Sequence, residues 1–303
     1  MIKFPLNVHR LIDLAVEEDL GTGDVTGKAI LDENAQGEAV ILARQELVLC
    51  GLDVAREVYR RIGAGVVLTS SISEGQTVGQ DAVLAELTGP VTVLLTGERI
   101  ALNFLQRLCG IATLAGRYAA AAGGRTTILD SRKTVPGWRW LDKMAVRVGG
   151  CTNHRMGLFD GILIKDNHIA ASGGIPEALA RARERAPAGM EIEIEVEDLD
   201  GVREAMENGA DIIMLDNFDP PDVVRAVRIN AGKARLELSG GIDLTNLGEY
   251  LDAAGLGSGR GVDFISIGAL THSAPAADIA MEIRSGNPAA ERHGDTGTRG
   301  RGE

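Results

Sequence analysis

Aromatic residues, cysteines and long hydrophobic runs are scarce in this 303-residue chain. Aromatics make up 3% of it, so the core must be aliphatic, built from Val, Ile, Leu and Ala. Cys50, Cys109 and Cys151 are widely spaced and form no CxxC pair, which argues against a disulfide framework or a zinc site and suits reduced thiols in a cytoplasmic protein. We expect neither a signal peptide nor a membrane span, because the N-terminus has no apolar core and no run of about eighteen uncharged apolar residues exists.

A net positive charge is also missing. The formal net charge is −12, and this disfavours a general nucleic-acid binder, which would usually be basic. An acidic protein can still bind an anion, but only through a local cluster of cations. With 45% hydrophobic residues, the chain is expected to be globular and long enough for one large domain or two moderate ones.

The first third of the chain is predicted to contain a helix and then a small sheet. Residues 1–20 read as a helix. Between residues 37 and 90, Val- and Leu-rich stretches punctuated by glycine predict short strands, with a helix at about 54–62. The run VTVLL at 91–95 is read as a further strand, and apolar residues at helical spacing predict a long helix over 97–122.

After residue 124 the pattern becomes strand, loop and helix, repeated. Most of the apolar runs are separated by 20 to 30 residues that include a helical stretch, as parallel strands with crossover helices require. Six strands suit an open α/β barrel better than a full eightfold one, and periodicity leaves a doubly wound sheet as the alternative. The predicted strands are 126–129, 162–164, 192–196, 212–215, 236–238 and 264–267.

Each predicted strand is followed by polar residues or glycine. Functional residues of parallel α/β folds collect at the carboxyl ends of strands, so these segments indicate one composite site with cationic, acidic and glycine-rich parts. The segments contain Ser131, Arg132 and Lys133; Lys165 and His168; Glu195 and Glu197; Asp216 and Asn217; Ser239, Gly240 and Gly241; and Gly268 and Ala269.

The cationic part is the most specific. Seven basic and only four acidic residues lie between Asp130 and His168, in a chain that is acidic overall. Arg grips a carboxylate or phosphate bidentately and Lys acts as a point charge, so the segment predicts a pocket for a multiply anionic substrate. We assign Arg132, Lys133, Arg155 and Lys165 to this pocket, since strand ends and loops carry function disproportionately.

The other basic residues of the segment are read differently. Arg139, Lys143 and Arg147 are expected to be helix-surface charges, since the last two are four residues apart on one predicted helix. His154 is expected to donate to an anion beside Arg155. His168 is left open between packing and the site.

Glu195 and Asp216 form the acidic part, on neighbouring strand ends. Two carboxylates at a phosphate-rich site suit Mg²⁺. They also suit ribose hydroxyls or a cationic sugar transition state. Spacing alone does not select Glu195, because Glu191, Glu193 and Glu197 alternate along the same strand.

The glycine-rich part follows the last two predicted strands, where barrels often hold a phosphate. Ser239, Gly240 and Gly241 stand after one strand and Gly268 after the other, with His272 close by. Two such turns together indicate a phosphate site.

Residues 130–169, DSRKTVPGWRWLDKMAVRVGGCTNHRMGLFDGILIKDNHI, closely resemble the signature of quinolinate phosphoribosyltransferases, also called nicotinate-nucleotide pyrophosphorylases. The resemblance extends through EDLGTGDVT (18–26), GERIALNFLQRLCGIAT (97–113) and ISIGALTHS (265–273), and leaves out only the tail. It implies a type II phosphoribosyltransferase that uses Mg²⁺. The implied reaction converts quinolinate and phosphoribosyl pyrophosphate to nicotinate mononucleotide, pyrophosphate and CO₂, on the de novo route to NAD.

The resemblance also implies the domain organisation. It predicts an N-terminal α/β sandwich domain over residues 1–115 and an open α/β-barrel catalytic domain over 116–273. Part of 274–285 is expected to pack back on the first domain. Composition, not the resemblance, predicts that 286–303 is a disordered tail, because it is rich in Gly, Arg and Thr and has no periodicity. The family resemblance further implies a homodimer whose sites lie at the interface.

Individual site residues carry over by position. Arg132, His154, Arg155 and Lys165 match the quinolinate-binding positions, and Arg99 matches the arginine that enters from the partner subunit. Lys133, Glu195 and Asp216 are the catalytic candidates, handling ribose, pyrophosphate and the metal, which Glu195 and Asp216 would bind. The remaining contacts to phosphoribosyl pyrophosphate are predicted at Ser131, Ser239, Gly240, Gly241, Ile267, Gly268, Ala269 and His272.

Two departures and two alternatives accompany this interpretation. Cys151 stands where many relatives have a third glycine, and residues 256–261 resemble a loop insertion. One alternative is a phosphoribosyltransferase-like protein associated with molybdenum transport, although the intact LIKDNH segment favours the quinolinate enzyme. The other is a non-catalytic anion-binding protein on the same scaffold, although all three parts of the site are retained.

Overall fold

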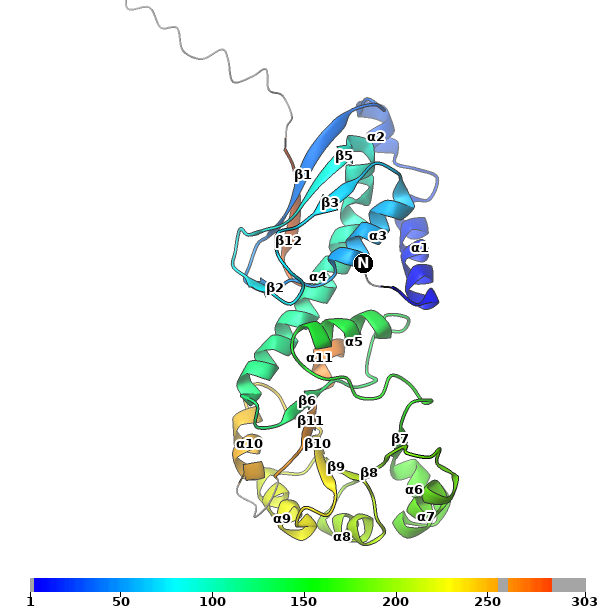
Figure 1. Ribbon diagram of the computed structural model, residues 1–303, viewed down its shortest axis with the longest axis vertical. Helices are drawn as coiled ribbons and strands as arrows, with labels where there is room; N and C mark the ends of the chain where they lie inside the picture. The colour runs from blue at the N-terminus through cyan, green and yellow to red at the C-terminus, as the bar shows by residue number, and fades with distance from the viewer. Residues whose placement is uncertain (1–2, 256–260, 285–303) are drawn as a thin grey trace, which may run out of the picture.

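The computed structural model describes residues 3–255 and 261–284. Two units are joined by the long helix α4 (Val91–Ala122), which runs from one into the other (Figure 1). The predicted tail at 286–303 lies outside the described residues, as does the insertion at 256–261 apart from Gly261. Within the described ranges, no helix combines the length and hydrophobicity needed to cross a membrane.

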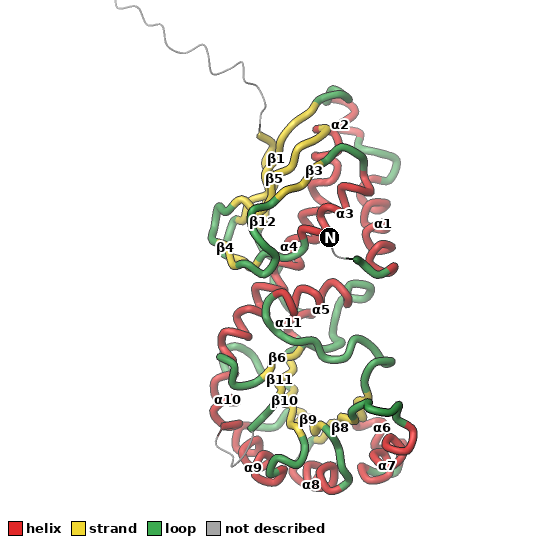
Figure 2. The backbone as a smooth tube through the Cα atoms, viewed as in Figure 1, coloured by secondary structure: helices red, strands yellow, loops and turns green. Residues whose placement is uncertain are grey.

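The N-terminal unit is a four-stranded antiparallel sheet with helices against one face (Figures 1 and 2). The sheet order is β12-β1-β5-β3. Its elements are α1 (Leu6–Leu20), α2 (Val25–Ile30), β1 (Gln36–Ala43), β2 (Leu47–Val48), α3 (Leu52–Ile62), β3 (Val67–Thr69), β4 (Thr77–Val78), β5 (Val83–Pro90) and, from the far end of the chain, β12 (Ile279–Arg284). Because β12 pairs with β1, the last described residues return to the first sheet.

The run at 91–95 is helical, so its prediction as a strand was wrong. Helix α4 begins at Val91, directly after Pro90. Leu94, Gly97 and Ala101 recur at helical spacing and are buried. A Cβ at Gly97 would lie 2.4 Å from Tyr59 Cε1, so α3 and α4 pack closely there. Tyr59 also donates to Leu94 O at 3.3 Å, so packing against α3 reaches into this run and favours the helix over the strand that β-branched residues prefer.

The second unit is a six-stranded parallel sheet in the order β6-β11-β10-β9-β8-β7. All six predicted strands are present: β6 (Thr127–Leu129), β7 (Ile162–Ile164), β8 (Ile192–Val196), β9 (Ile212–Asp216), β10 (Arg235–Ser239) and β11 (Phe264–Ser266). Strands β7 to β11 follow one another in chain order, and β6 adds beside β11. In a doubly wound sheet the order of the strands would reverse in the middle of the sheet. The order found here does not, so the open barrel is confirmed.

The barrel is open between β6 and β7, and an irregular segment lies at this opening. Thr152 forms a parallel bridge with Leu129, its N–H donates to Ile128 O at 2.9 Å, and its carbonyl accepts from Asp130 N at 3.2 Å. The residues that follow Thr152 therefore run beside the end of β6.

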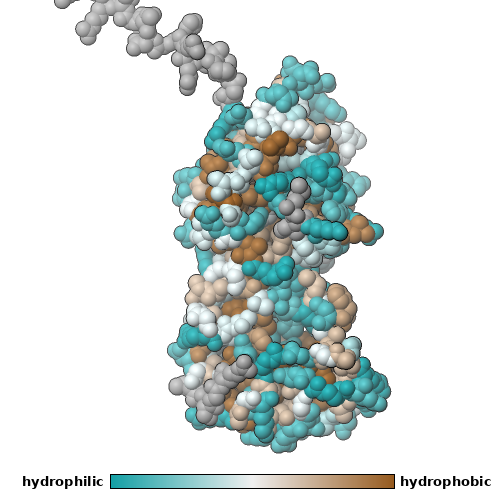
Figure 3. All heavy atoms as spheres, viewed as in Figure 1, coloured by the Kyte–Doolittle hydropathy of each residue, from teal (hydrophilic) through white to brown (hydrophobic). Residues whose placement is uncertain are grey.

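Most helices of this unit lie outside the strands, whereas α5 and α11 pack beside α4 (Figure 2). Their bounds are α5 (Arg139–Val148), α6 (Asp166–Ser172), α7 (Ile175–Arg185), α8 (Leu199–Glu207), α9 (Pro220–Asn230), α10 (Leu247–Gly255) and α11 (Ala269–His272). Apolar strand residues such as Ile194 and Ile213 are buried in the hydrophobic core. Alternation then turns their neighbours into the barrel. On the face drawn in Figure 3 the hydrophobic areas are small and separate.

Candidate active site

A cavity of about 630 Å³ lies at the carboxyl ends of the barrel strands. It brings together fourteen of the residues predicted for the site, from all six strands and the segment after Thr152. These are Ser131, Arg132, Lys133, His154, Arg155, Lys165, Glu195, Asp216, Ser239, Gly240, Gly241, Gly268, Ala269 and His272.

Arg99 and Ile267 are the two predicted site residues that do not line this cavity. Arg99 is exposed on α4 in the N-terminal unit. The Ile267 side chain is buried in the core, and its N–H donates to Leu129 O at 2.8 Å.

We call the side of the cavity that contains Arg132, Arg155 and Lys165 the cationic wall. The guanidinium groups of its two arginines have N–H donors that are not used. The Nε atoms of Arg132 and Arg155 are buried and have no hydrogen-bond partner within the described part of the chain. Arg155 donates one other N–H to Gly161 O at 3.0 Å. Burial, and then the charge of Arg132, lowers the pKa of Arg155. Buried donors without partners are costly, so this wall is suited to an anion that would satisfy them.

The acidic wall is built by β8 and β9. Glu195 forms an ion pair with Lys165, and Asp216 accepts from Asn217 Nδ2 at 2.8 Å. Burial, and then the charge of Glu195, raises the pKa of Asp216. The two carboxylates therefore repel each other, and a divalent cation between them would relieve that repulsion. This donor set fits Mg²⁺.

Two glycines allow the phosphate-side turns. Gly240 has φ +95°, and a Cβ there would lie 2.1 Å from Asn217 Oδ1. A Cβ at Gly268 would lie 3.1 Å from Lys133 Cδ and 3.2 Å from His272 Nε2. At both positions a side chain would crowd its neighbours, so glycine leaves the backbone accessible, and a backbone that approaches a phosphate closely needs such a position.

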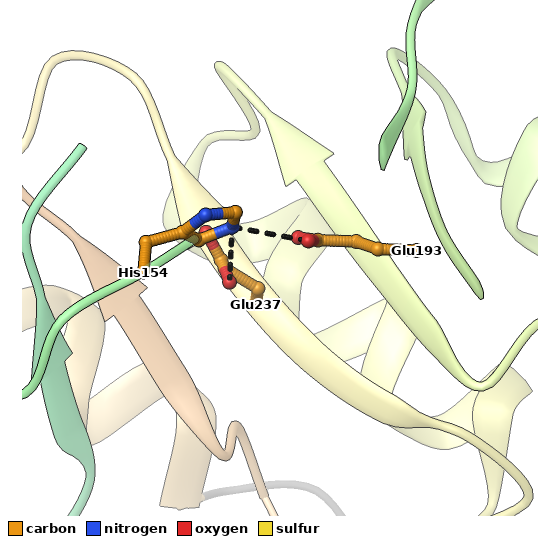
Figure 4. A group of neighbouring side chains, drawn as sticks. All are labelled: His154, Glu193 and Glu237. Atoms are coloured by element: carbon orange, nitrogen blue, oxygen red, sulfur yellow. Dashed lines mark hydrogen bonds and ion pairs between the residues drawn. The ribbon is translucent and has the colours of Figure 1, made fainter. Parts of the chain in front are cut away.

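His154 lies against two carboxylates inside the barrel, as Figure 4 shows. Its Nε2 is 3.0 Å from Glu193 Oε2 and 3.8 Å from Glu237 Oε2. Burial, and then the charge of Glu193, raises the pKa of Glu237 well above its usual range. Glu193 and Glu195 both point into the barrel, each toward a different cavity. Spacing along the strand did not separate these two glutamates in the sequence.

The same three side chains offer one nitrogen and two oxygens within 4.8 Å of one another, a set that could hold a metal ion. However, His154 Nδ1 accepts from Arg155 N at 2.8 Å. The proton of a neutral ring is then on Nε2, which donates to Glu193 and has no free lone pair for a metal. We therefore assign these residues to a hydrogen-bonded cluster.

The expectation that Arg139, Lys143 and Arg147 are all helix-surface charges was wrong for the first two. Lys143 is fully buried and pairs with Asp130. Arg139 is half-buried and donates to Thr134 Oγ1 at 3.1 Å and Met156 O at 3.3 Å. Arg147 is exposed, as predicted. Helical spacing compares only residues of one helix, so it cannot predict that Lys143 pairs with a buried residue outside the helix.

His168 has a structural role. Its Nδ1 accepts from Lys165 N at 3.0 Å, which caps the start of α6. This contact favours the packing alternative that the sequence left open.

Several cavity residues were missed by sequence reasoning. Met214, Glu237 and Ser266 also line the cavity. Each lies two residues before a predicted site residue: Met214 and Glu237 share a strand with that residue, and Ser266 ends β11 just before Gly268. Strand alternation could have found them. Asp130, Leu163, Ile242 and Asp243 complete the lining.

A second cavity, of about 870 Å³, adjoins the first. It shares His154, Arg155 and Glu237 with the first cavity and reaches the opening residues of β9 and β10. The hydrogen-bonded cluster therefore lies between the two cavities.

Comparison with known proteins gives consistent results. Residues 24–109 match the quinolinate phosphoribosyl transferase N-terminal domain, and residues 111–282 match its C-terminal domain. The chain is 41% identical over 288 residues to a probable nicotinate-nucleotide pyrophosphorylase (carboxylating) of Bacillus subtilis, covering 94% of this chain and 96% of that one. It is 37% identical over 292 residues to a quinolinate phosphoribosyltransferase (decarboxylating) of Nicotiana tabacum, covering 90% and 81%.

Solved structures agree in fold. The nicotinate-nucleotide pyrophosphorylase from Francisella tularensis superposes with a TM-score of 0.87 at 40% identity, covering 93% of this chain and 98% of that one. That from Ehrlichia chaffeensis gives 0.85 at 35% identity, covering 93% and 100%. Matches of this extent in both units, over the residues that form the cavity, leave one assignment: the chain belongs to the quinolinate phosphoribosyl transferase family.

Proposed function

We propose that this chain joins quinolinate to the phosphoribosyl group of phosphoribosyl pyrophosphate and releases nicotinate mononucleotide, pyrophosphate and CO₂, as a step of NAD biosynthesis. The proposal rests on one cavity that combines three groups. They are two Arg Nε donors with no partner among the described residues, a pair of carboxylates and two glycine turns. These three groups correspond to a ring dicarboxylate, a metal-bound pyrophosphate and a sugar phosphate.

In the proposed reaction, Arg132, Arg155 and Lys165 bind the two ring carboxylates, and His154 forms the adjoining wall. This direction of binding points the ring nitrogen at C1 of the ribose. The nitrogen lone pair forms the new bond to C1 as the bond from C1 to pyrophosphate breaks, and Lys133 stabilises the leaving oxygen.

Decarboxylation follows from the new positive charge on the ring. The bond to the carboxylate beside the nitrogen breaks, CO₂ leaves, and the electron pair remains on the ring carbon until a proton from solvent replaces the lost group. The N-alkylated ring stabilises that electron pair. Glu195 and Asp216 hold the ribose and offset positive charge that develops at C1.

The residues that would hold Mg²⁺ are Glu195 and Asp216, whose mutual repulsion supports the assignment. When bound, the ion supplies charge neutralisation to the pyrophosphate. The phosphate end of the substrate is assigned to Ser131, Ser239, Gly240, Gly241, Gly268, Ala269 and His272, with Ile267 holding the turn to β6 through its N–H.

We also propose a homodimer in which Arg99 of each subunit enters the partner's site. The exposure of Arg99 on α4, outside its own cavity, supports this arrangement. A cytoplasmic location is proposed as well, and the three unpaired thiols are consistent with a reducing compartment.

The test is to incubate the purified protein with quinolinate, phosphoribosyl pyrophosphate and Mg²⁺ while following nicotinate mononucleotide and CO₂. Both products should appear together and should vanish without Mg²⁺. A folded protein that binds phosphoribosyl pyrophosphate but yields no product would contradict the proposal. It would favour the molybdenum-associated relative or an anion-binding protein instead.

A further inference from the structure

A buried ion pair adjoins the cationic wall, with Asp130 at the edge of the cavity, and the proposed reaction does not use it. Asp130 follows β6 and Lys143 lies in α5, and both side chains are 0% exposed. Lys143 Nζ donates to Asp130 Oδ1. Such a pair is a weak source of stability, because burying both charges costs about as much as their attraction returns. Any role of the pair therefore depends on the other groups that its two side chains contact.

The other hydrogen bonds of the pair hold the backbone of His154. Asp130 Oδ1 accepts from His154 N at 2.8 Å, and Lys143 Nζ donates to His154 O at 3.0 Å. Asn153 Nδ2 bridges the pair, donating to Asp130 Oδ2 at 2.7 Å and Lys143 O at 2.9 Å. The peptide groups on both sides of His154 are thus held by the two opposite charges.

The pair also links the two halves of the cationic wall. Asp130 is separated from Arg132 by one residue, and its carboxylate binds the segment that continues to Arg155. The charge of Arg132 acts on Arg155, so these two guanidinium groups repel each other. An anchor between their backbones would oppose that repulsion before any anion arrives.

The phosphate side of the cavity has separate anchors. Gly240 follows β10, and Gly268 follows β11. Lys133, although close in sequence to Asp130, has its own contact, since its carbonyl accepts from Thr271 Oγ1 at 2.9 Å. The hydrogen bonds of the ion pair thus go to Asn153 and His154, and none that the structure describes goes to the turns after β10 and β11.

We infer that Asp130 and Lys143 are positioning residues for the dicarboxylate substrate. They hold Arg132 and the segment from Asn153 to Arg155 at the spacing that two carboxylates on one ring require, and they contribute little to binding phosphoribosyl pyrophosphate. This inference rests on the proposed function.

The test uses the double variant Asp130→Asn with Lys143→Met, which removes both charges and leaves neither one buried alone. The Kd for quinolinate, measured by calorimetry, should rise about tenfold or more, whereas the KM for phosphoribosyl pyrophosphate should change less than about threefold. Without any ligand, amide hydrogens of residues 153–156 should exchange about tenfold faster, with β8 and β9 unchanged.

The matched control is Arg147→Met, which removes an exposed cation from the same helix. It should change neither the exchange rates nor the Kd. If the double variant does not fold, Asn153→Ala replaces it, because it removes only the bridging amide. A rise of about threefold in the quinolinate Kd and faster exchange at residues 154–156 are then expected.

Equal losses of affinity for both substrates would overturn the inference, and so would unchanged exchange at residues 153–156. The exchange experiment requires no substrate. Failure of the proposed function would look different, because the wild-type protein itself would then bind no quinolinate.

Discussion

His154 Nε2 donates to Glu193 Oε2 at 3.0 Å, while Nδ1 of the same ring accepts from the Arg155 backbone N–H at 2.8 Å. Both ring nitrogens are thus engaged within the protein, and the ring is held as a neutral donor. Glu193 and Glu237 have carboxylate oxygens within 4.8 Å of each other, and Glu237 is 1% exposed. Two buried carboxylates this near each other favour keeping one of them protonated.

Stability should therefore fall with rising pH because of Glu237. Its pKa is raised in the folded state, first by burial and then by Glu193, so the folded protein binds more protons than the unfolded chain above about pH 4.3. Glu237→Gln removes this effect. Its unfolding free energy should exceed that of the wild type by about 1 kcal/mol or more at pH 8 and by less at pH 5, measured in urea. Parallel pH profiles would contradict the assignment.

Lys165→Met should impair quinolinate binding and catalysis together. It removes one cation from the proposed dicarboxylate site and the ion-pair partner of Glu195. We expect kcat/KM for quinolinate to fall about a hundredfold, while the melting temperature changes little because Lys165 is half exposed. Steady-state kinetics and thermal unfolding provide the check. A loss confined to thermal stability would argue against a role in the site.

Gly240→Ala should damage the phosphate side. The new Cβ would clash with Asn217 at a backbone φ of +95° that L residues rarely adopt. The KM for phosphoribosyl pyrophosphate should rise about tenfold, with a cost of about 1–3 kcal/mol in unfolding free energy. Gly248→Ala in α10 is the matched control, since a Cβ there meets nothing within 4 Å. It should leave activity intact and be neutral or slightly stabilising.

A mixing experiment tests the proposed dimer. Arg99→Ala and Lys133→Ala should each be nearly inactive alone. After subunit exchange, a mixed dimer contains one site with both residues intact, so equal amounts should recover about a quarter of wild-type activity. Absence of recovery, despite exchange verified by mass spectrometry, would mean that Arg99 does not act across the interface.

The sequence predicted the fold correctly where the local pattern of apolar residues agrees with the arrangement of the whole sheet. Apolar runs separated by helical stretches identified all six barrel strands, because parallel strands require such crossovers. Polar residues after those runs converge in one cavity, since the carboxyl ends of parallel strands meet at one rim. The family resemblance selected Glu195 from its neighbours, which spacing did not do.

Other features depend on contacts that no local pattern reports. The run at 91–95 is helical although its β-branched residues alone favour a strand, and within it Leu94 O accepts from Tyr59, which is far away in sequence. Lys143 has the spacing of a surface residue, yet it is buried because Asp130 and the His154 carbonyl satisfy its charge there. The sequence by itself determined which barrel strands form and which chemistry reaches their ends. Only the tertiary structure decided which charges are buried, because burying a charge depends on partners that folding brings together.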